Sequence, residues 1–149
     1  MNLIPSKLFR QSLLTAVLAW TSTAPMMASA ADTATFSAAL SGAAEVPANT
    51  SAGSGTLEAT LDKETNTLTW KVTFVGLSGP ATMAHFHGPA MPGANAGVVV
   101  PFPSAVSPVE GKATLNAAQV ADLMAGKWYA NVHTAANPGG EIRGQLMLK

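Results

Sequence analysis

The sequence predicts an all-β fold, namely a Greek-key β-sandwich of about seven to eight strands with one short helix. Short segments alternate between apolar and polar residues, which is the pattern of strands that place one face on a core. Turn-forming Gly, Pro, Asn and Asp residues separate these segments at short spacing. Charged residues make up only 11% of the chain, and Ala, Gly, Thr, Ser and Val dominate the rest. This composition favours strands joined by tight turns.

Residues 1–30 are predicted to be a secretory signal peptide. Lys7 and Arg10 form a basic region, residues 12–20 are apolar, and Ala28-Ser29-Ala30 fits an A-x-A cleavage site. Cleavage after Ala30 would leave residues 31–149 as one domain, periplasmic or secreted. An uncleaved anchor is the alternative.

The rest of the chain disfavours several classes of partner. No later segment approaches about twenty apolar residues, so no membrane insertion is expected after cleavage. Without Lys7 and Arg10, six of the eight basic residues remain against eight acidic ones, which disfavours nucleic acid. Because the chain has no cysteine, stability outside the cytosol must come from the core or from a bound ion.

The first half of the chain predicts three strands. Residues 33–40 form the first, followed by a bend at 41–47 and a polar loop. Residues 56–61 and 67–75 alternate cleanly on either side of a turn and form the strongest predicted hairpin. Trp70 lies on the inward side of this alternation, so a core position is expected rather than a ligand pocket.

The middle of the chain predicts a strand at residues 81–87, a loop at 88–97 and a second strand at 98–100. The run Val98-Val99-Val100 is typical of a strand that is buried on both faces or that crosses a barrel. Three prolines between residues 101 and 108 indicate that the next segment is irregular or lies at a sheet edge.

The end of the chain predicts one helix and two strands. Residues 117–125 form the helix, with Asn116 as N-cap, Gln119 in the capping-box position and Gly126 after the last turn. The strands follow at 128–134 and 141–148. In the last strand Ile142, Gly144, Leu146 and Leu148 should face inward, and Glu141, Arg143 and Gln145 outward. Glu141 and Arg143 either serve a site near His133 or form a solvated pair.

All three histidines lie in predicted strands beside turns. His85 and His87 are two residues apart, so both face one side of a strand while Phe86 faces the other. His133 shares a strand face with Tyr129. Each histidine alone fits a structural imidazole, but together they predict one metal site made of His85, His87 and His133. Ligation at about 2.0–2.1 Å per bond requires ring nitrogens within about 4 Å of one another.

Three stretches of the chain resemble the chordin-type (CHRD) domain. They are LSGAAEVP at residues 40–47, AHFHGPA at 84–90, and WYANVHT at 128–134 with PGGEIRGQ at 138–145. The resemblance implies an extracytoplasmic, immunoglobulin-like β fold. The domain is found singly in secreted bacterial proteins and repeated in the animal developmental regulator chordin, and its biochemical role is largely unassigned.

A weaker likeness is to copper/zinc superoxide dismutase. There too a corner of the type Gly76-Leu77 leads into a His-x-His strand of a Greek-key sandwich, to which His85 and His87 could correspond. That enzyme uses more histidines, an aspartate and a disulfide that this chain cannot supply.

Three functions are compatible with these patterns. The first is metal binding by the three histidines, with copper as the first choice of ion and zinc as the second. Water, Met91 or a substrate would fill the open coordination position. The second is an interaction module for a protein or glycan, in which the histidines fix the loops at 88–97 and 134–140. The third is a copper-dependent redox enzyme of the superoxide dismutase type. No other catalytic residues are predicted, because the sequence has no cysteine nucleophile, Gly-x-Ser-x-Gly elbow or phosphate loop.

Overall fold

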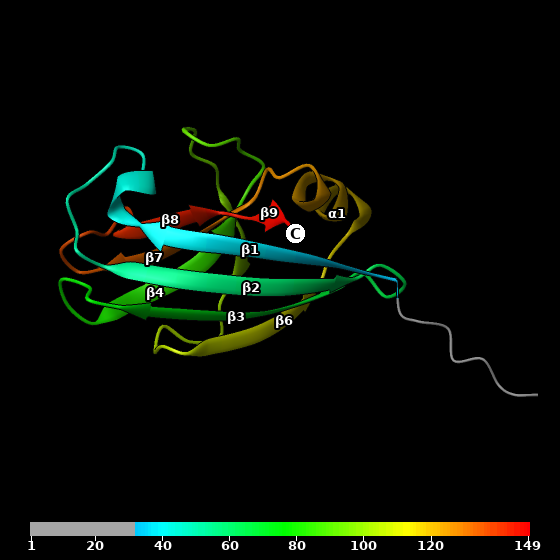
Figure 1. Cartoon of the computed structure of the whole chain (residues 1–149), viewed down its shortest axis with the longest axis horizontal. Helices are drawn as coiled ribbons and strands as arrows, with labels where there is room; N and C mark the ends of the chain where they lie inside the picture. Colours follow the sequence, from blue (N-terminus) through cyan, green and yellow to red (C-terminus); the bar gives the residue numbers. More distant parts are fainter. Residues whose placement is uncertain (1–31) are drawn as a thin grey trace, which may run out of the picture.

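A computed structural model describes residues 32–149 (Figure 1). The predicted signal peptide, residues 1–30 with cleavage after Ala30, lies outside the described residues. Within residues 32–149 the chain forms nine strands, one 3-10 turn and one α-helix. In chain order they are β1 (Thr33–Ser41), η1 (Gly42–Ala44), β2 (Ser54–Asp62), β3 (Thr67–Val75), β4 (Ala81–His87), β5 (Val98–Pro101), β6 (Val109–Thr114), α1 (Ala117–Met124), β7 (Tyr129–Thr134), β8 (Ile142–Gln145) and β9 (Met147–Leu148).

The strands form one sheet that folds back on itself into two layers. Their order is β5-β4-β7-β8-β1-β2-β3-β6, with β9 paired to β1. The link between the layers is narrow, because β8 and β1 share only the pair Ser41–Arg143. Trp70 of β3 meets Phe86 of β4 edge to face with ring centroids 5.1 Å apart, so the two layers pack face to face. The predicted all-β sandwich is confirmed.

The core follows from the alternation of the strands. The β2–β3 hairpin pairs residue by residue from Ser54–Val75 to Asp62–Thr67 and buries its inward Leu, Val and Trp side chains. Trp70 is a core residue, as expected. β8 lies between β7 and β1, so a strand from the end of the chain is the neighbour of the first strand. The sandwich has more strands than predicted, because residues 109–114 pair with β3 and the last strand divides at Leu146.

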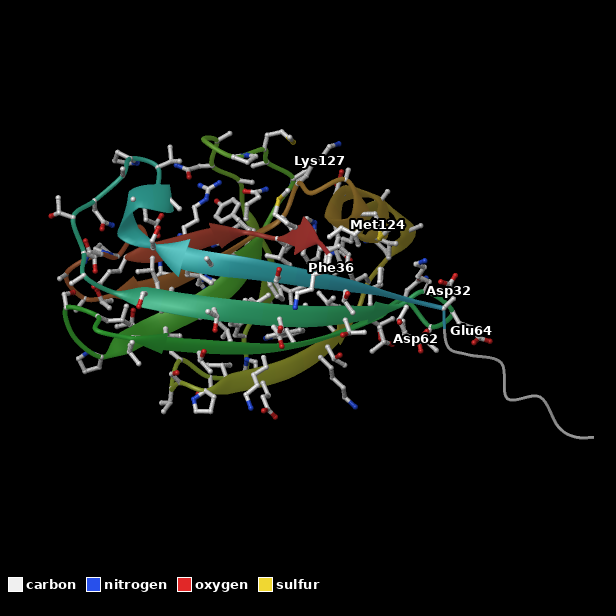
Figure 2. All side chains as sticks on the ribbon, in the orientation of Figure 1. Asp32, Phe36, Asp62, Glu64, Met124 and Lys127 are labelled. Carbon is white, nitrogen blue, oxygen red and sulfur yellow. The ribbon has the colours of Figure 1, made fainter. Side chains whose placement is uncertain are left out.

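The helix begins as the sequence predicts. The Asn116 side chain accepts from the Gln119 backbone N–H and the Gln119 side chain accepts from the Asn116 N–H, both at 2.9 Å, which completes the capping box. Gly126, with φ +69°, follows the last turn. Leu123 is the buried residue of the helix. Met124, labelled in Figure 2, is its last residue and is partly exposed.

Two predictions about the strands are wrong. Val98–Pro101 is not buried on both faces: it pairs with β4 alone at the end of the strand order, and Val98 is 51% exposed. A run of three valines therefore does not distinguish a central strand from an edge. Leu148 does not face the core, because the chain changes partner at Leu146, β9 pairs with β1, and Leu148 is 52% exposed.

The predicted solvated pair of Glu141 and Arg143 is also wrong. Glu141 is fully buried and Arg143 is 2% exposed, and no ion pair joins them. Residues 143 and 145 do lie on the outer side of the sheet, but loops cover that side. Alternation of residue types therefore identified the face of the strand but not whether the face is covered.

Hydrogen bonds from neutral groups hold the buried Glu141 carboxylate. Ser51 Oγ donates to it at 2.7 Å, the Ser78 N–H and Oγ donate at 2.6 Å each, and Thr134 Oγ1 completes the set. Burial alone would raise the pKa of Glu141, but the bonds from Ser78, Thr134 and Ser51 outweigh it and lower the pKa to about 2. One carboxylate thereby ties together the loop before β2, the corner before β4 and the end of β7.

Glu141→Gln should destabilise the fold by about 3 kcal/mol at neutral pH, because an amide places donors against donors. The folded-state pKa lies below the usual 4.5, so the carboxylate contributes stability above pH 4.5 that is lost as the pH falls toward 2. Urea denaturation between pH 2 and 7 should show that the free energy of unfolding falls less at acid pH for Glu141→Gln than for the wild type. Glu110→Gln, at an exposed residue paired with Lys71, should follow the wild type. Equal acid loss in all three proteins would contradict this account.

Candidate metal centre

The pairing of β4 with β7 brings the three histidines together. The two strands are antiparallel neighbours, with Met83 opposite His133 and His87 opposite Tyr129. The inward residues of β4 enter the core, so alternate residues of both strands share the outer face. One ring nitrogen from each of His85, His87 and His133 lies within 4.8 Å of the other two. The structure thus groups the three residues that the sequence suggested.

Backbone contacts fix the protonation of His133. Its Nδ1 lies 3.0 Å from the Pro138 carbonyl oxygen, which can only accept, so Nδ1 carries the proton and Nε2 has a free lone pair. That Nε2 lies 3.2 Å from Nδ1 of His85. With all rings neutral, His85 Nδ1 therefore donates to His133. His133 is held by a main-chain acceptor, yet its second nitrogen faces the cluster.

His87 has the same arrangement with one difference. Its Nδ1 donates to the Ala96 carbonyl oxygen at 3.0 Å, which leaves a lone pair on Nε2. That Nε2 is buried and has no hydrogen-bond partner. An unsatisfied buried polar atom costs about 1–3 kcal/mol, so a native structure that keeps one calls for a reason. A bound cation would satisfy this lone pair.

The cluster is wider than one ion requires. The 3.2 Å between His85 and His133 suits two ligands of one ion, but the 4.8 Å limit for the whole set exceeds the expected 4 Å. His87 is the distant member, since its ring centroid is 5.5 Å from that of His85 and 6.0 Å from that of His133. Ligation therefore requires His87 to approach by roughly an ångström, a distance that side-chain rotation can supply.

The surroundings of the cluster favour neutral imidazoles. Burial lowers the pKa of His85, and the nearby His133 and His87 lower it further. Burial also lowers the pKa of His87 and of His133, although the hydrogen bonds to Ala96 and Pro138 act in the opposite direction. Neutral imidazoles are the form that binds transition metals. Asp62 and Glu64 at the β2–β3 turn, and Asp32 just before β1, lie at the opposite end of the molecule from the β7–β8 turn (Figures 1 and 2).

Two loops cover the outer face beside the histidines. The segment with η1 and the loop at residues 88–97 are linked by Asn95, whose side chain donates to the Val46 carbonyl at 2.9 Å. Arg143 donates to the Asn95 side chain at 2.9 Å and to the Ala94 carbonyl at 2.7 Å. In Figure 1 both segments lie on the side of β7 and β8 away from β2 and β3. This covering explains why every residue of β7 is buried.

Tyr129 connects this cover to the cluster. Its ring stacks on His87, with centroids 4.9 Å apart and an interplanar angle of 5°. The Arg143 guanidinium carbon lies 3.4 Å from the centroid of the same ring. The Tyr129 hydroxyl accepts from the Ala96 N–H at 3.1 Å and lies 3.3 Å from the Ala96 carbonyl oxygen that His87 also contacts. Tyr129 thus positions both His87 and its acceptor.

Glu45 is the acidic group of this outer layer. Asn131 Nδ2 donates to the two carboxylate oxygens of Glu45 at 2.9 and 3.0 Å. The side-chain oxygen of Asn131, Oδ1, has no partner. Burial raises the pKa of Glu45 to about 7, against the lowering effects of Asn131 and Arg143. Glu45 therefore titrates well above the usual range of a carboxyl group.

Sequence reasoning missed three residues of this region. Alternation placed Tyr129 on the face of His133 but did not show that its ring stacks on His87. No alternation pattern encodes the contact of Glu45 with Asn131. Met83 is different, since it lies two residues before His85 and thus on the same face of β4, directly opposite His133. The spacing Met-x-His-x-His was visible in the sequence and would have identified it.

The fold and this cluster define an all-β domain with a candidate metal centre on the outer face of one layer. The chain belongs to the CHRD domain family, whose model matches residues 36–146. Comparison with curated proteins and with solved structures gave no match. The family assignment confirms the resemblance drawn from the three sequence motifs.

Glu45→Gln should make the fold less sensitive to alkaline pH. The folded-state pKa of about 7 exceeds the usual 4.5, so stability from the protonated form is present below pH 4.5 and is lost as the pH rises through 7. The substituted amide stays neutral at every pH and keeps an oxygen that can accept from Asn131 Nδ2. Denaturation at pH 5 and pH 8 should show the variant gaining stability relative to the wild type at the higher pH. Both proteins keep all three histidines, so the difference between their free energies of unfolding reports Glu45 alone. A difference that is the same at pH 5 and pH 8 would refute the raised pKa of Glu45.

Proposed function

We propose that this protein is an exported CHRD-domain protein that binds a transition-metal ion through His85, His87 and His133. The ion is copper first and zinc second. The observation that carries the proposal is the buried, unpartnered Nε2 of His87 beside two imidazoles that also present nitrogens. Carbonyls already hold Nδ1 of His87 and of His133, so both Nε2 lone pairs are left for the cluster. The lone pair of His87 is free, and that of His133 accepts from His85.

The nature of the three donors supports copper and zinc. Neutral imidazole nitrogen suits both ions, and affinity for such sites peaks at Cu²⁺ along the divalent series. Three protein ligands leave one coordination position open on a four-coordinate ion.

Binding requires one internal change. His85 Nδ1 donates to His133 in the metal-free form. To become a ligand, this nitrogen must give up its proton, so that the neutral ring carries its proton on Nε2 instead. His85 is half-buried, and its Nε2 is not among the buried atoms that lack a partner. The neutral ring can therefore hold its proton on Nε2, and the ion replaces the His85–His133 hydrogen bond.

A second candidate is an interaction module, and specific contacts favour it as well. His87 and His133 hydrogen-bond the carbonyls of Ala96 and Pro138, so they fix the loops at 88–97 and 134–140 as that alternative expects. These loops would then present a surface to a protein or glycan. The two candidates differ at His87 Nε2, which has no partner in the described structure and which a bound metal ion would satisfy.

Titration of the purified protein with Cu²⁺ or Zn²⁺ should give one ion per chain. His87→Ala and His133→Ala should each weaken metal binding at least tenfold, because each leaves only two imidazoles and removes a ring that a backbone carbonyl orients. Isothermal titration calorimetry measures both stoichiometry and affinity. Bound ion should also raise the thermal midpoint of the wild type.

Glu110→Ala is the matched control, since it removes an exposed carboxylate on β6 that could hold an ion nonspecifically. Its affinity should equal that of the wild type. Histidine variants that bind as tightly as the wild type would exclude the site. In that case metal-free protein that keeps its stability and captures a partner would support the interaction module.

Export is the other part of the proposal. CHRD domains occur in extracellular proteins, and the basic region, apolar stretch and A-x-A site of residues 1–30 fit a signal peptide. Full-length protein expressed in a bacterium with a Sec pathway should accumulate outside the cytosol. N-terminal sequencing should begin at Ala31, and an intact Met1 in the recovered protein would contradict cleavage.

A further inference from the structure

The histidine cluster has a covered end and an open end. His87 lies under the loop at residues 88–97, through its contact with Ala96. Four residues earlier on the same face of β4, Met83 is 48% exposed. A hollow of about 230 Å³ lies beside this end of the cluster and is lined by Met83, His85 and the segment after β5. The side of His85 toward Met83 is therefore the accessible side of the cluster.

The register of the sheet places Met83 within reach of the ion. Met83 pairs directly with His133 across β4 and β7, and directly opposed residues have Cβ atoms about 4.5–5.5 Å apart. It is also two residues from His85 on one strand face. A methionine side chain has three rotatable bonds, and an exposed one can reorient without disturbing the core. Its thioether sulfur can thus approach the point where the His85 and His133 nitrogens meet.

Met91, the other methionine near the site, lies at the covered end of the cluster. The backbone N–H of its neighbour Ala90 donates to the Lys127 carbonyl at 2.8 Å. Lys127 lies before the start of β7, and the step from Tyr129 to His133 alone spans roughly 13 Å of extended strand. Met91 therefore cannot share an ion with His133, although sequence reasoning considered it for the open position. It is a matched control for Met83, because both are exposed methionines.

We propose that Met83 is the fourth ligand of the metal site and makes it prefer Cu⁺ to Zn²⁺. The inference rests on the proposed metal binding by the three histidines and adds the identity of the fourth donor and of the ion. A neutral thioether is a soft donor that selects Cu⁺, whereas Zn²⁺ gains little from it and is served by water at that position. A neutral set of three nitrogens and one sulfur suits a singly charged ion in a half-buried site.

The test measures Cu⁺ affinity, under ascorbate without oxygen and in competition with a coloured Cu⁺ chelator, alongside Zn²⁺ affinity. Met83→Leu should weaken Cu⁺ binding about tenfold and leave Zn²⁺ binding unchanged. Met91→Leu should change neither affinity. X-ray absorption of the Cu⁺ protein should show a sulfur neighbour in the wild type and in Met91→Leu, but not in Met83→Leu. Because Met83 is exposed, the Met83→Leu variant should keep the thermal midpoint of the metal-free wild type.

Met83→His gives a second readout that does not depend on loss of binding. A fourth imidazole should raise Zn²⁺ affinity and reduce the preference for Cu⁺. Wild-type protein that binds Cu⁺ without a sulfur neighbour, or as tightly as Met83→Leu, would overturn the role of Met83 while leaving the histidine site intact. Wild-type protein that binds neither copper, in either oxidation state, nor Zn²⁺ would overturn both proposals.

Discussion

The register between β4 and β7 is the constraint on which the candidate site depends. Met83 faces His133 and His87 faces Tyr129, so a slip of one residue would turn the β4 histidines inward and Phe86 outward. Phe86 resists this slip, because it is buried and packs against Trp70, Phe102 and Trp128 in the core. The same aromatic contacts that join the two layers of the sandwich therefore hold the imidazoles on the outer face.

The outer face forms a second, polar interior. Arg143, Asn131 and Glu45 lie under the loops that cover β7 and β8, where hydrogen bonds rather than apolar contacts provide the cohesion. Such groups are costly to bury unless they are paired, and most of them are. Four buried side-chain atoms in the described part of the chain have no partner, namely His87 Nε2, Asn131 Oδ1, Trp70 Nε1 and Gln145 Oε1. The first two belong to or adjoin the histidine cluster.

Local patterns predicted most of the fold. Alternation identified β3 and β4 with their observed bounds, and the Asn116–Gln119 capping box placed the start of the helix. These features depend on neighbours along the chain. Patterns failed where the outcome depends on distant segments, as with the edge position of β5 and the covering of Arg143 by the loop at residues 88–97.

The candidate site shows the same division. Strand periodicity predicted that His85 and His87 share a face, and the grouping with His133 followed from the scarcity of histidine. The protonation of each ring was not predictable, because it depends on the carbonyls of Ala96 and Pro138, which reach the rings only through the folded loops. The role of Tyr129 likewise depends on its place in the sheet between β4 and β8.

Tyr129 has one further consequence. It is the only tyrosine in the chain, and its ring stacks on an imidazole of the cluster. A positive charge arriving at His87 would alter the electric field on this aromatic ring and so shift its ultraviolet absorption and its proton resonances. The spectrum of Tyr129 would therefore report a cation bound at His87 without an attached label.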